Sequence, residues 1–198
     1  GICLKSEAMN LAVIMELPLV VLDVQRGGPA TGLPTKSEQT DLLQVLFGRN
    51  GESPMPVLAA TSPTDCFEAA FEASKMALEH MTPVVLLTDA FIANGSAAWK
   101  LPKLAEYPAI NPPFVPAELK GAWTPYQRNE EGVRYWAIPG TEGFTHILGG
   151  LEKDNATGAI STNPENHHLM TRLRQQKIDN IKVPDVVVEG DKDDAELL

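Results

Sequence analysis

The chain has 198 residues, enough for one domain with a sizeable hydrophobic core or for a domain with an extension. Its hydrophobic content of 43% excludes a wholly disordered protein, and its formal charge of −10 argues against nucleic-acid partners and anionic membrane surfaces. No apolar run is long enough to cross a bilayer and no basic signal-peptide start is present, so we expect a cytosolic protein without a membrane partner.

The first half of the chain alternates between strand and helix patterns. Apolar runs at residues 17–24, 56–60 and 83–89 predict three strands. Between these runs, the apolar residues of 37–47 and 62–81 recur at helical spacing and predict two helices. Strands and helices in this order predict parallel strands joined by right-handed crossovers. The expected fold class is therefore α/β, a parallel sheet with helices on both faces, followed by an arm rich in proline and aromatic residues.

Each predicted helix has an apolar stripe that we expect to face the sheet. The stripe of the N-terminal helix consists of Leu4, Ala8, Leu11, Ala12 and Met15. The helix at 37–47, with Ser37 as its expected N-cap, has a stripe of Leu42, Leu43 and Leu46. The helix that opens with Ser-Pro-Thr-Asp at 62–65 has a stripe of Phe67, Ala70, Phe71, Ser74, Ala77, Leu78 and Met81.

A loop from Gln25 to Thr35 follows the first predicted strand at its carboxyl end, where open α/β sheets bind their ligands. Gly27, Gly28 and Gly32 allow a close approach of the backbone to a ligand. Arg26 offers a planar guanidinium that matches a carboxylate or a phosphate. The residues by themselves leave open a plain turn whose arginine pairs with a neighbouring acid.

A few other residues have side chains suited to chemistry. Asp23, near the end of the first strand, is expected to face a site or to cap the loop. Cys3 and Cys66 are not part of a Cys-x-x-Cys pair, which excludes an iron–sulfur cluster or a zinc site built by this chain alone, and we expect both thiols to be buried. A structural role is favoured for His146. The adjacent His167 and His168 point in different directions and do not form a joint metal site.

The second half of the chain has a different character. Residues 101–139 contain seven prolines and few periodic runs, which predicts an extended arm that lies across a neighbouring subunit or domain. A hairpin at 143–158 and a helix opened by Asn163 and Pro164 should follow. Because the apolar stripe of this helix is thin (Met170, Leu173 and Ile181), we expect it to dock outside its own domain. Residues 185–198 are acidic and resemble a solvated linker.

The loop sequence Gln-Arg-Gly-Gly-Pro-Ala-Thr-Gly-Leu-Pro-Thr, followed by Glu38-Gln39 and Asp41-Leu42-Leu43, resembles the α subunit of 2-oxoacid:ferredoxin oxidoreductases, most of all the 2-oxoglutarate enzymes. The similarity extends from Gly1 to the tail and loosens after about Trp99. It implies that residues 1–100 are the C-terminal half of a thiamine diphosphate-binding, pyrimidine-type α/β domain. Residues 101–184 would be an arm with a hairpin and a helix, and residues 185–198 a linker to a second domain of a longer protein.

The resemblance also implies an activity, the oxidative decarboxylation of a 2-oxoacid with acyl transfer to coenzyme A and electron transfer to ferredoxin. Thiamine diphosphate, Mg²⁺ and a [4Fe–4S] centre would be held mainly by a partner β subunit, and none by this chain alone. This chain would supply substrate-binding residues and no catalytic residue. The implied substrate-binding residues are Arg26, Thr31, Gly27, Gly28 and Gly32. The segment on its own is expected to be inactive.

The chain departs from the family pattern at two positions. Asn50 stands where a histidine is expected and cannot titrate, and Ala30 stands where serine is common. Two other functions remain open. A phosphate- or nucleotide-binding α/β module would lack the Gly-x-Gly-x-x-Gly turn that opens into a helix. A non-catalytic assembly subunit would bind partners through the arm and the tail.

Overall fold

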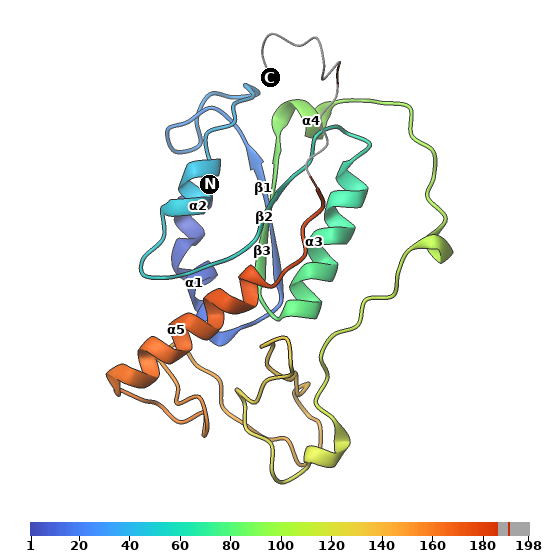
Figure 1. Ribbon diagram of the computed structural model, residues 1–198. Coiled ribbons are helices and arrows are strands. Elements are labelled where there is room, and N and C mark those ends of the chain that lie inside the picture. The colour runs from blue at the N-terminus through green and yellow to red at the C-terminus, as the bar shows by residue number, and fades with distance from the viewer. Residues whose placement is uncertain (186–189, 191–198) are drawn as a thin grey trace.

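The computed structural model describes residues 1–185 and 190, so most of the predicted acidic linker lies outside the described residues. Three parallel strands form a sheet in the order β1-β3-β2 (Figure 1). Their bounds are β1 Leu19–Gln25, β2 Val57–Ala59 and β3 Pro83–Asp89. The predicted strands are therefore confirmed to within two residues at each end.

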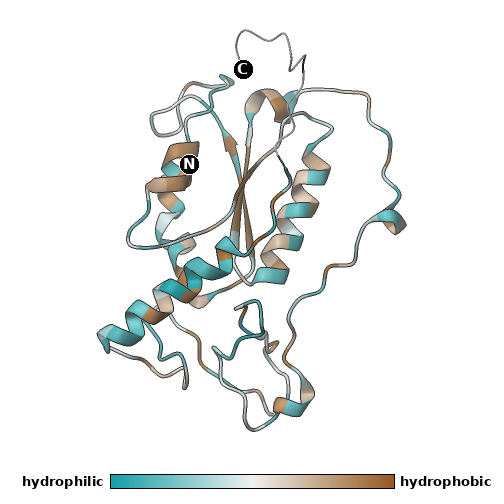
Figure 2. Cartoon of the chain, in the orientation of Figure 1, coloured by the Kyte–Doolittle hydropathy of each residue, from teal (hydrophilic) through white to brown (hydrophobic). Residues whose placement is uncertain are grey.

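Helices cover the sheet on both faces, as the sequence predicts. On one face α1 (Ser6–Met15) and α2 (Leu42–Phe47) pack against Val85 and Leu87 of β3. On the other face α3 (Cys66–His80) packs against the alternate β3 residues. Every residue of β3 is buried, which explains the apolar run from Pro83 to Leu87, and the strands are mostly hydrophobic in Figure 2.

Of the predicted buried face of the N-terminal helix, only Ala12 is confirmed as buried, and the rest of the stripe is wrong. Leu4 is 85% exposed and Leu11 is 44% exposed, whereas α1 buries Met9, Ala12 and Val13. The segment begins with a 3₁₀ turn, Ile2–Lys5, whose three residues per turn shift the helical phase, so that Ile2 is buried in place of Leu4. The same shift exposes Cys3, against the prediction of a buried thiol, while Cys66 is partly buried.

The second predicted helix is shorter than expected. It begins at Leu42 rather than after Ser37, because hydrogen bonds to the ends of the strands hold residues 39–41 outside the helix. Only Val45 of α2 is buried. The stripe that was expected to face the sheet is exposed, by 46% at Leu42, 66% at Leu43 and 37% at Leu46.

Helix α3 presents two different faces. Ala73 and Ala77 are buried against the sheet, and their small side chains allow the helix to lie close to the strands. Phe67 and Phe71 instead contact the arm, where the ring of Tyr107 lies 5.7 Å and 4.8 Å from theirs. Part of the predicted apolar stripe therefore binds the arm rather than the sheet. Helix α4, Ala90–Asn94, follows β3 and is capped by Asp89.

The arm is extended, as predicted, and contains two short 3₁₀ turns, Leu104–Glu106 and Ala117–Leu119 (Figure 1). The predicted hairpin is reduced to a turn with an isolated bridge between Lys153 and Ile160. Helix α5, Pro164–Asp179, starts as predicted, with the Asn163 side chain accepting from the Asn166 N–H. Among the described residues no helix combines the length and apolarity needed to cross a membrane.

Helix α5 docks on its own domain, which corrects the prediction of an outside partner. Lys177 lies 2.7 Å from the Glu16 carboxylate and donates to the Met81 carbonyl oxygen at 2.9 Å. Arg128 from the arm donates to the same carboxylate at 2.8 Å, and Arg134 donates to the Glu16 carbonyl oxygen at 3.0 Å. Buried charge thus adds to the thin apolar stripe of α5, of which Met170 is fully buried, and links the end of α1, the arm and α5.

Candidate functional site: the loop at the carboxyl end of the sheet

The loop that follows β1 is closed by its own backbone. The Gly27 N–H donates to the Lys36 carbonyl oxygen at 3.1 Å, and the Leu33 N–H donates to the Gly27 carbonyl oxygen at 3.0 Å. A third bond, 2.9 Å long, joins the Gly32 N–H to Pro29. These bonds hold the loop in a compact shape at the carboxyl edge of the sheet, where a ligand is expected.

Glycine is required at one loop position by the fold itself. Gly32 has a φ of +64°, and a Cβ there would lie 1.2 Å from the Gly27 carbonyl oxygen. Gly27 is less restricted, since its Cβ would lie 3.1 Å from the Glu38 carboxylate. A Cβ on Gly28 would meet nothing within 4 Å. Close packing within the loop therefore explains Gly32 and leaves Gly28 available to a ligand.

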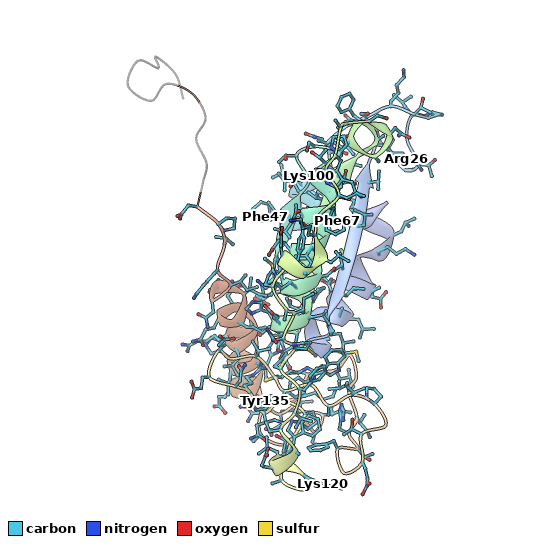
Figure 3. All side chains as sticks on the ribbon, turned by 90° about the vertical axis from the view of Figure 1, so that its right-hand side faces the viewer. Arg26, Phe47, Phe67, Lys100, Lys120 and Tyr135 are labelled. Atoms are coloured by element: carbon cyan, nitrogen blue, oxygen red, sulfur yellow. The ribbon has the colours of Figure 1, made fainter. Side chains whose placement is uncertain are left out.

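The structure brings Arg26 and Thr31 onto this single loop, where both are exposed. Figure 3 shows Arg26 at one end of the molecule, far from Lys120 and Tyr135 at the other. Among the described residues no carboxylate forms an ion pair with Arg26. The simple turn with a paired arginine is thus not the arrangement seen, and the guanidinium is available to an anion.

Two hydrogen bonds that the sequence did not reveal anchor the return of the loop. The Gln39 amide donates to the Asp89 carboxylate at 2.8 Å, and the Asp41 N–H donates to the Gln25 side-chain oxygen at 2.9 Å. The Ile92 N–H and the Gln39 amide hold the pKa of Asp89 below its usual range. The sequence did contain a signal for these bonds, since Gln25 and Asp89 each end an apolar strand. Buried polar groups need hydrogen-bond partners, so both side chains could be expected to bind a nearby segment.

Asp23 lies below this anchor, 9% exposed on β1. Its Oδ2 atom is buried without a hydrogen-bond partner in the described part of the chain. Burial, together with the negative charge of Asp41, raises the pKa of Asp23 to about 6. Asp23 is buried near the carboxyl end of β1, and its expected role, facing a site or capping the loop, stays a prediction.

The histidines singled out in the sequence, His146 and His167, make contacts with neighbouring residues of the fold. The imidazole of His146 bonds to the Phe144 carbonyl oxygen at 2.8 Å and lies edge-on to Trp123. His167 lies 2.7 Å from the Glu152 carboxylate. Nowhere in residues 1–185 do three histidine, cysteine, aspartate or glutamate side chains gather as metal ligands would. The described donors therefore fit an anion at the loop and do not fit a bound divalent metal or an iron–sulfur cluster.

Asn50 lies away from the loop, beside a cleft of about 790 Å³ between α1, the turn at 50–53 and α5. Its side chain bonds to Asn10, which also accepts a 2.7 Å hydrogen bond from the Ser53 hydroxyl. This position fixes the turn against α1.

Known proteins are similar to this chain along its whole length. Residues 1–163 match the family described as "Pyruvate flavodoxin/ferredoxin oxidoreductase, thiamine diP-bdg". The whole chain is 57% identical to the 2-oxoglutarate oxidoreductase subunit KorA of Mycobacterium tuberculosis and covers 30% of that protein. Over 90% of the chain, identity is 30% to the 2-oxoglutarate synthase subunit KorA of Methanothermobacter thermautotrophicus, of which 46% is covered.

One solved structure has a closely similar fold. It is the 2-oxoglutarate:ferredoxin oxidoreductase from Magnetococcus marinus with 2-oxoglutarate, coenzyme A and succinyl-CoA bound. The TM-score is 0.81 at 35% identity, over 90% of this chain and 31% of that one. The chain thus spans less than half the length of each of these proteins.

Proposed function

The chain belongs to the pyruvate flavodoxin/ferredoxin oxidoreductase family, and we propose that it forms part of the α subunit of a cytosolic 2-oxoglutarate:ferredoxin oxidoreductase. In this reaction the 2-oxoacid loses its carboxylate as CO₂, the remaining acyl group passes to coenzyme A, and the electrons pass to ferredoxin. The pyrimidine-type α/β fold and the loop after β1 support this assignment over a generic phosphate-binding module.

The observation that carries the proposal is the exposed guanidinium of Arg26, which has no ion pair within the described part of the chain, on a loop fixed by its own backbone. A guanidinium binds a carboxylate through two parallel hydrogen bonds, which fix both the position and the orientation of the acid. Thr31 lies on the same loop and can donate its hydroxyl hydrogen to the substrate. Holding the 2-oxoacid in one orientation lowers the barrier to attack on its carbonyl carbon.

The similarity to this family supports an assignment of the cofactors to the assembly. Thiamine diphosphate, when bound, supplies the carbon nucleophile for the 2-oxoacid carbonyl group. The resemblance implies that a partner β subunit holds Mg²⁺, the [4Fe–4S] centre and the diphosphate, and the described residues of this chain gather no set of metal ligands. This chain then binds and orients the 2-oxoacid at the interface.

The test uses the full-length subunit co-purified with its partner and measures 2-oxoglutarate-dependent reduction of a viologen dye. We expect Arg26→Ala to raise the KM for 2-oxoglutarate about 10- to 100-fold, the effect of losing hydrogen bonds to a charged group. The KM for coenzyme A should stay unchanged. Arg26→Lys is the matched control, since it keeps the charge but loses the two-pronged geometry, and should be intermediate.

Two outcomes would contradict the proposal. Equal increases in the KM for 2-oxoglutarate and for coenzyme A would remove the carboxylate-binding role of Arg26. No reduction with any 2-oxoacid, in a complex loaded with its cluster and thiamine diphosphate, would favour a non-catalytic assembly subunit.

A further inference from the structure

The residue before Arg26 is fixed at both ends of its side-chain amide. The buried Gln25 donates from Nε2 to the Thr88 carbonyl oxygen at 3.3 Å, and its Oε1 atom accepts from the Asp41 N–H at 2.9 Å. A carbonyl oxygen can only accept and an N–H can only donate, so these two partners determine the orientation of the amide. Gln25 thus joins the end of β3 to the chain that returns from the loop.

The residue after Arg26 is held by the same returning segment, which we define as residues 36–41. The Gly27 N–H donates to the carbonyl oxygen of Lys36, the first residue of this segment, at 3.1 Å. Arg26 therefore lies between two residues that the returning segment holds, one through a side chain and one through the backbone. The position of the guanidinium consequently depends on where the returning segment lies.

Asp89 holds the returning segment from outside the loop. It ends β3, in register with Gln25 on β1, and is buried. Its Oδ2 atom accepts from the Gln39 amide at 2.8 Å, and its Oδ1 atom accepts from the Ile92 N–H at 2.9 Å. The first turn of α4 thus fixes the carboxylate, and the second oxygen is directed at the returning segment. Because the acceptor is ionised, the bond to Gln39 is stronger than one between neutral groups.

We propose that Gln39 and Asp89 are positioning residues, and that the hydrogen bond between them fixes the returning segment and, through it, the guanidinium of Arg26. Neither side chain touches the 2-oxoacid. Small misplacements of a group that orients the substrate are costly, so loss of the bond should weaken binding of the 2-oxoacid. This effect on the substrate rests on the proposed function, whereas the effect on the loop does not.

Gln39→Glu tests the bond with little change in side-chain shape. It replaces the donor with a carboxylate, which repels Asp89 at about pH 7.5, where both groups are ionised. Adding Asp89→Asn exchanges donor and acceptor, because the asparagine amide can donate to the new carboxylate while its oxygen still accepts from the Ile92 N–H. The single variant should lose the bond and the double variant should regain it. Position 39 is exposed, so the substitution there does not disturb the core.

The matched control is Gln175→Glu. The Gln175 amide also donates to an aspartate, Asp179, at 2.8 Å, and both residues are exposed. They belong to α5, which lies at the opposite end of the sheet from the loop (Figure 1). The control therefore makes the same chemical change to the same kind of hydrogen bond at a distance from Arg26.

The first measurement is hydrogen–deuterium exchange of residues 26–41 in the full-length subunit with its partner. Protection in Gln39→Glu should fall about 10-fold, the effect of losing one hydrogen bond to a charged group. The double variant should return to the protection of the wild type, and Gln175→Glu should match the wild type. The second measurement is the KM for 2-oxoglutarate, which should rise by a similar factor in Gln39→Glu and recover in the double variant. The KM for coenzyme A should stay unchanged in all three variants.

Three results would overturn the inference. The first is unchanged protection of the loop in Gln39→Glu. The second is a loss of protection that the double variant does not restore, because exchanging donor and acceptor rescues a hydrogen bond but not a role of side-chain shape. The third is reduced protection with an unchanged KM for 2-oxoglutarate. Exchange needs no turnover, so a complex that responds as expected in exchange but reduces no dye with any 2-oxoacid would contradict the proposed function instead.

Discussion

The carbonyl oxygen of Gly27 fills the space that a side chain on Gly32 would need, 1.2 Å from the position of its Cβ. Gly32→Ala should therefore open the loop, with faster proteolysis between residues 26 and 36 and a loss of 2-oxoacid binding. Gly28→Ala is the matched control, because its Cβ would meet nothing within 4 Å and the loop should stay resistant. Equal resistance of both variants to proteolysis would contradict this reading of the loop.

A second prediction concerns the buried contact between α1 and α5. Lys177→Met removes the cation 2.7 Å from Glu16, where both side chains are almost fully buried. Glu16 keeps Arg128 as a partner, so the loss of Lys177 leaves the buried carboxylate only partly compensated. We expect a loss of about 3 kcal/mol in the free energy of unfolding, the lower end of the cost of breaking a buried ion pair. Lys103→Met breaks an exposed pair with Glu106 and should leave the urea midpoint unchanged.

Acid should weaken the same contact. Burial alone would raise the pKa of Glu16, but the charges of Lys177 and Arg128 outweigh it and hold the pKa well below the usual range. A carboxylate with a lowered native pKa stabilises the fold fully above its unfolded pKa, and this contribution is lost as the pH falls. The free energy of unfolding should therefore decline below about pH 5. Glu16→Gln should be less stable at neutral pH and should show a smaller decline.

The arm provides another test. Tyr107 packs edge-on against Phe67 and Phe71 and donates its hydroxyl hydrogen to Glu68. Tyr107→Ala should release this part of the arm and speed tryptic cleavage at the nearby lysines, Lys100 and Lys103. Tyr107→Phe keeps the ring contacts and should stay close to the wild type. If phenylalanine behaves like alanine, the bond to Glu68 and not the aromatic packing holds the arm.

The sheet could be predicted from the sequence because each strand is an apolar run between turn signals. β3 matches its prediction at both ends, and the loop of residues 25–35 follows β1 as predicted. The glycine pattern also indicated a loop that approaches a ligand. What the pattern could not show was which glycine the loop itself needs, since the clash at Gly32 depends on the carbonyl of Gly27 five residues earlier.

The failures have a common physical cause. Apolar periodicity identifies a stripe but not the surface that covers it, so exposed residues of α2 such as Leu43 were assigned to the core. Conversely, a pattern of apolar residues cannot predict that a charged side chain is buried. Lys177 and Arg174 of α5 can be buried because each pairs with a carboxylate, Glu16 for Lys177 and Glu152 for Arg174, that lies outside the helix. Such pairs become evident only once the fold brings the elements together.

The contact between Glu16 and Lys177 joins residues 161 positions apart, and Arg128 lies 112 positions from the same carboxylate. During synthesis from the N-terminus, β1, β2 and β3 are all available before either cation has emerged from the ribosome. Glu16 must then remain hydrated at the base of the nascent sheet until the arm and α5 arrive. The docking of α5 is therefore a late, slow step, because it closes the longest loop of the described chain.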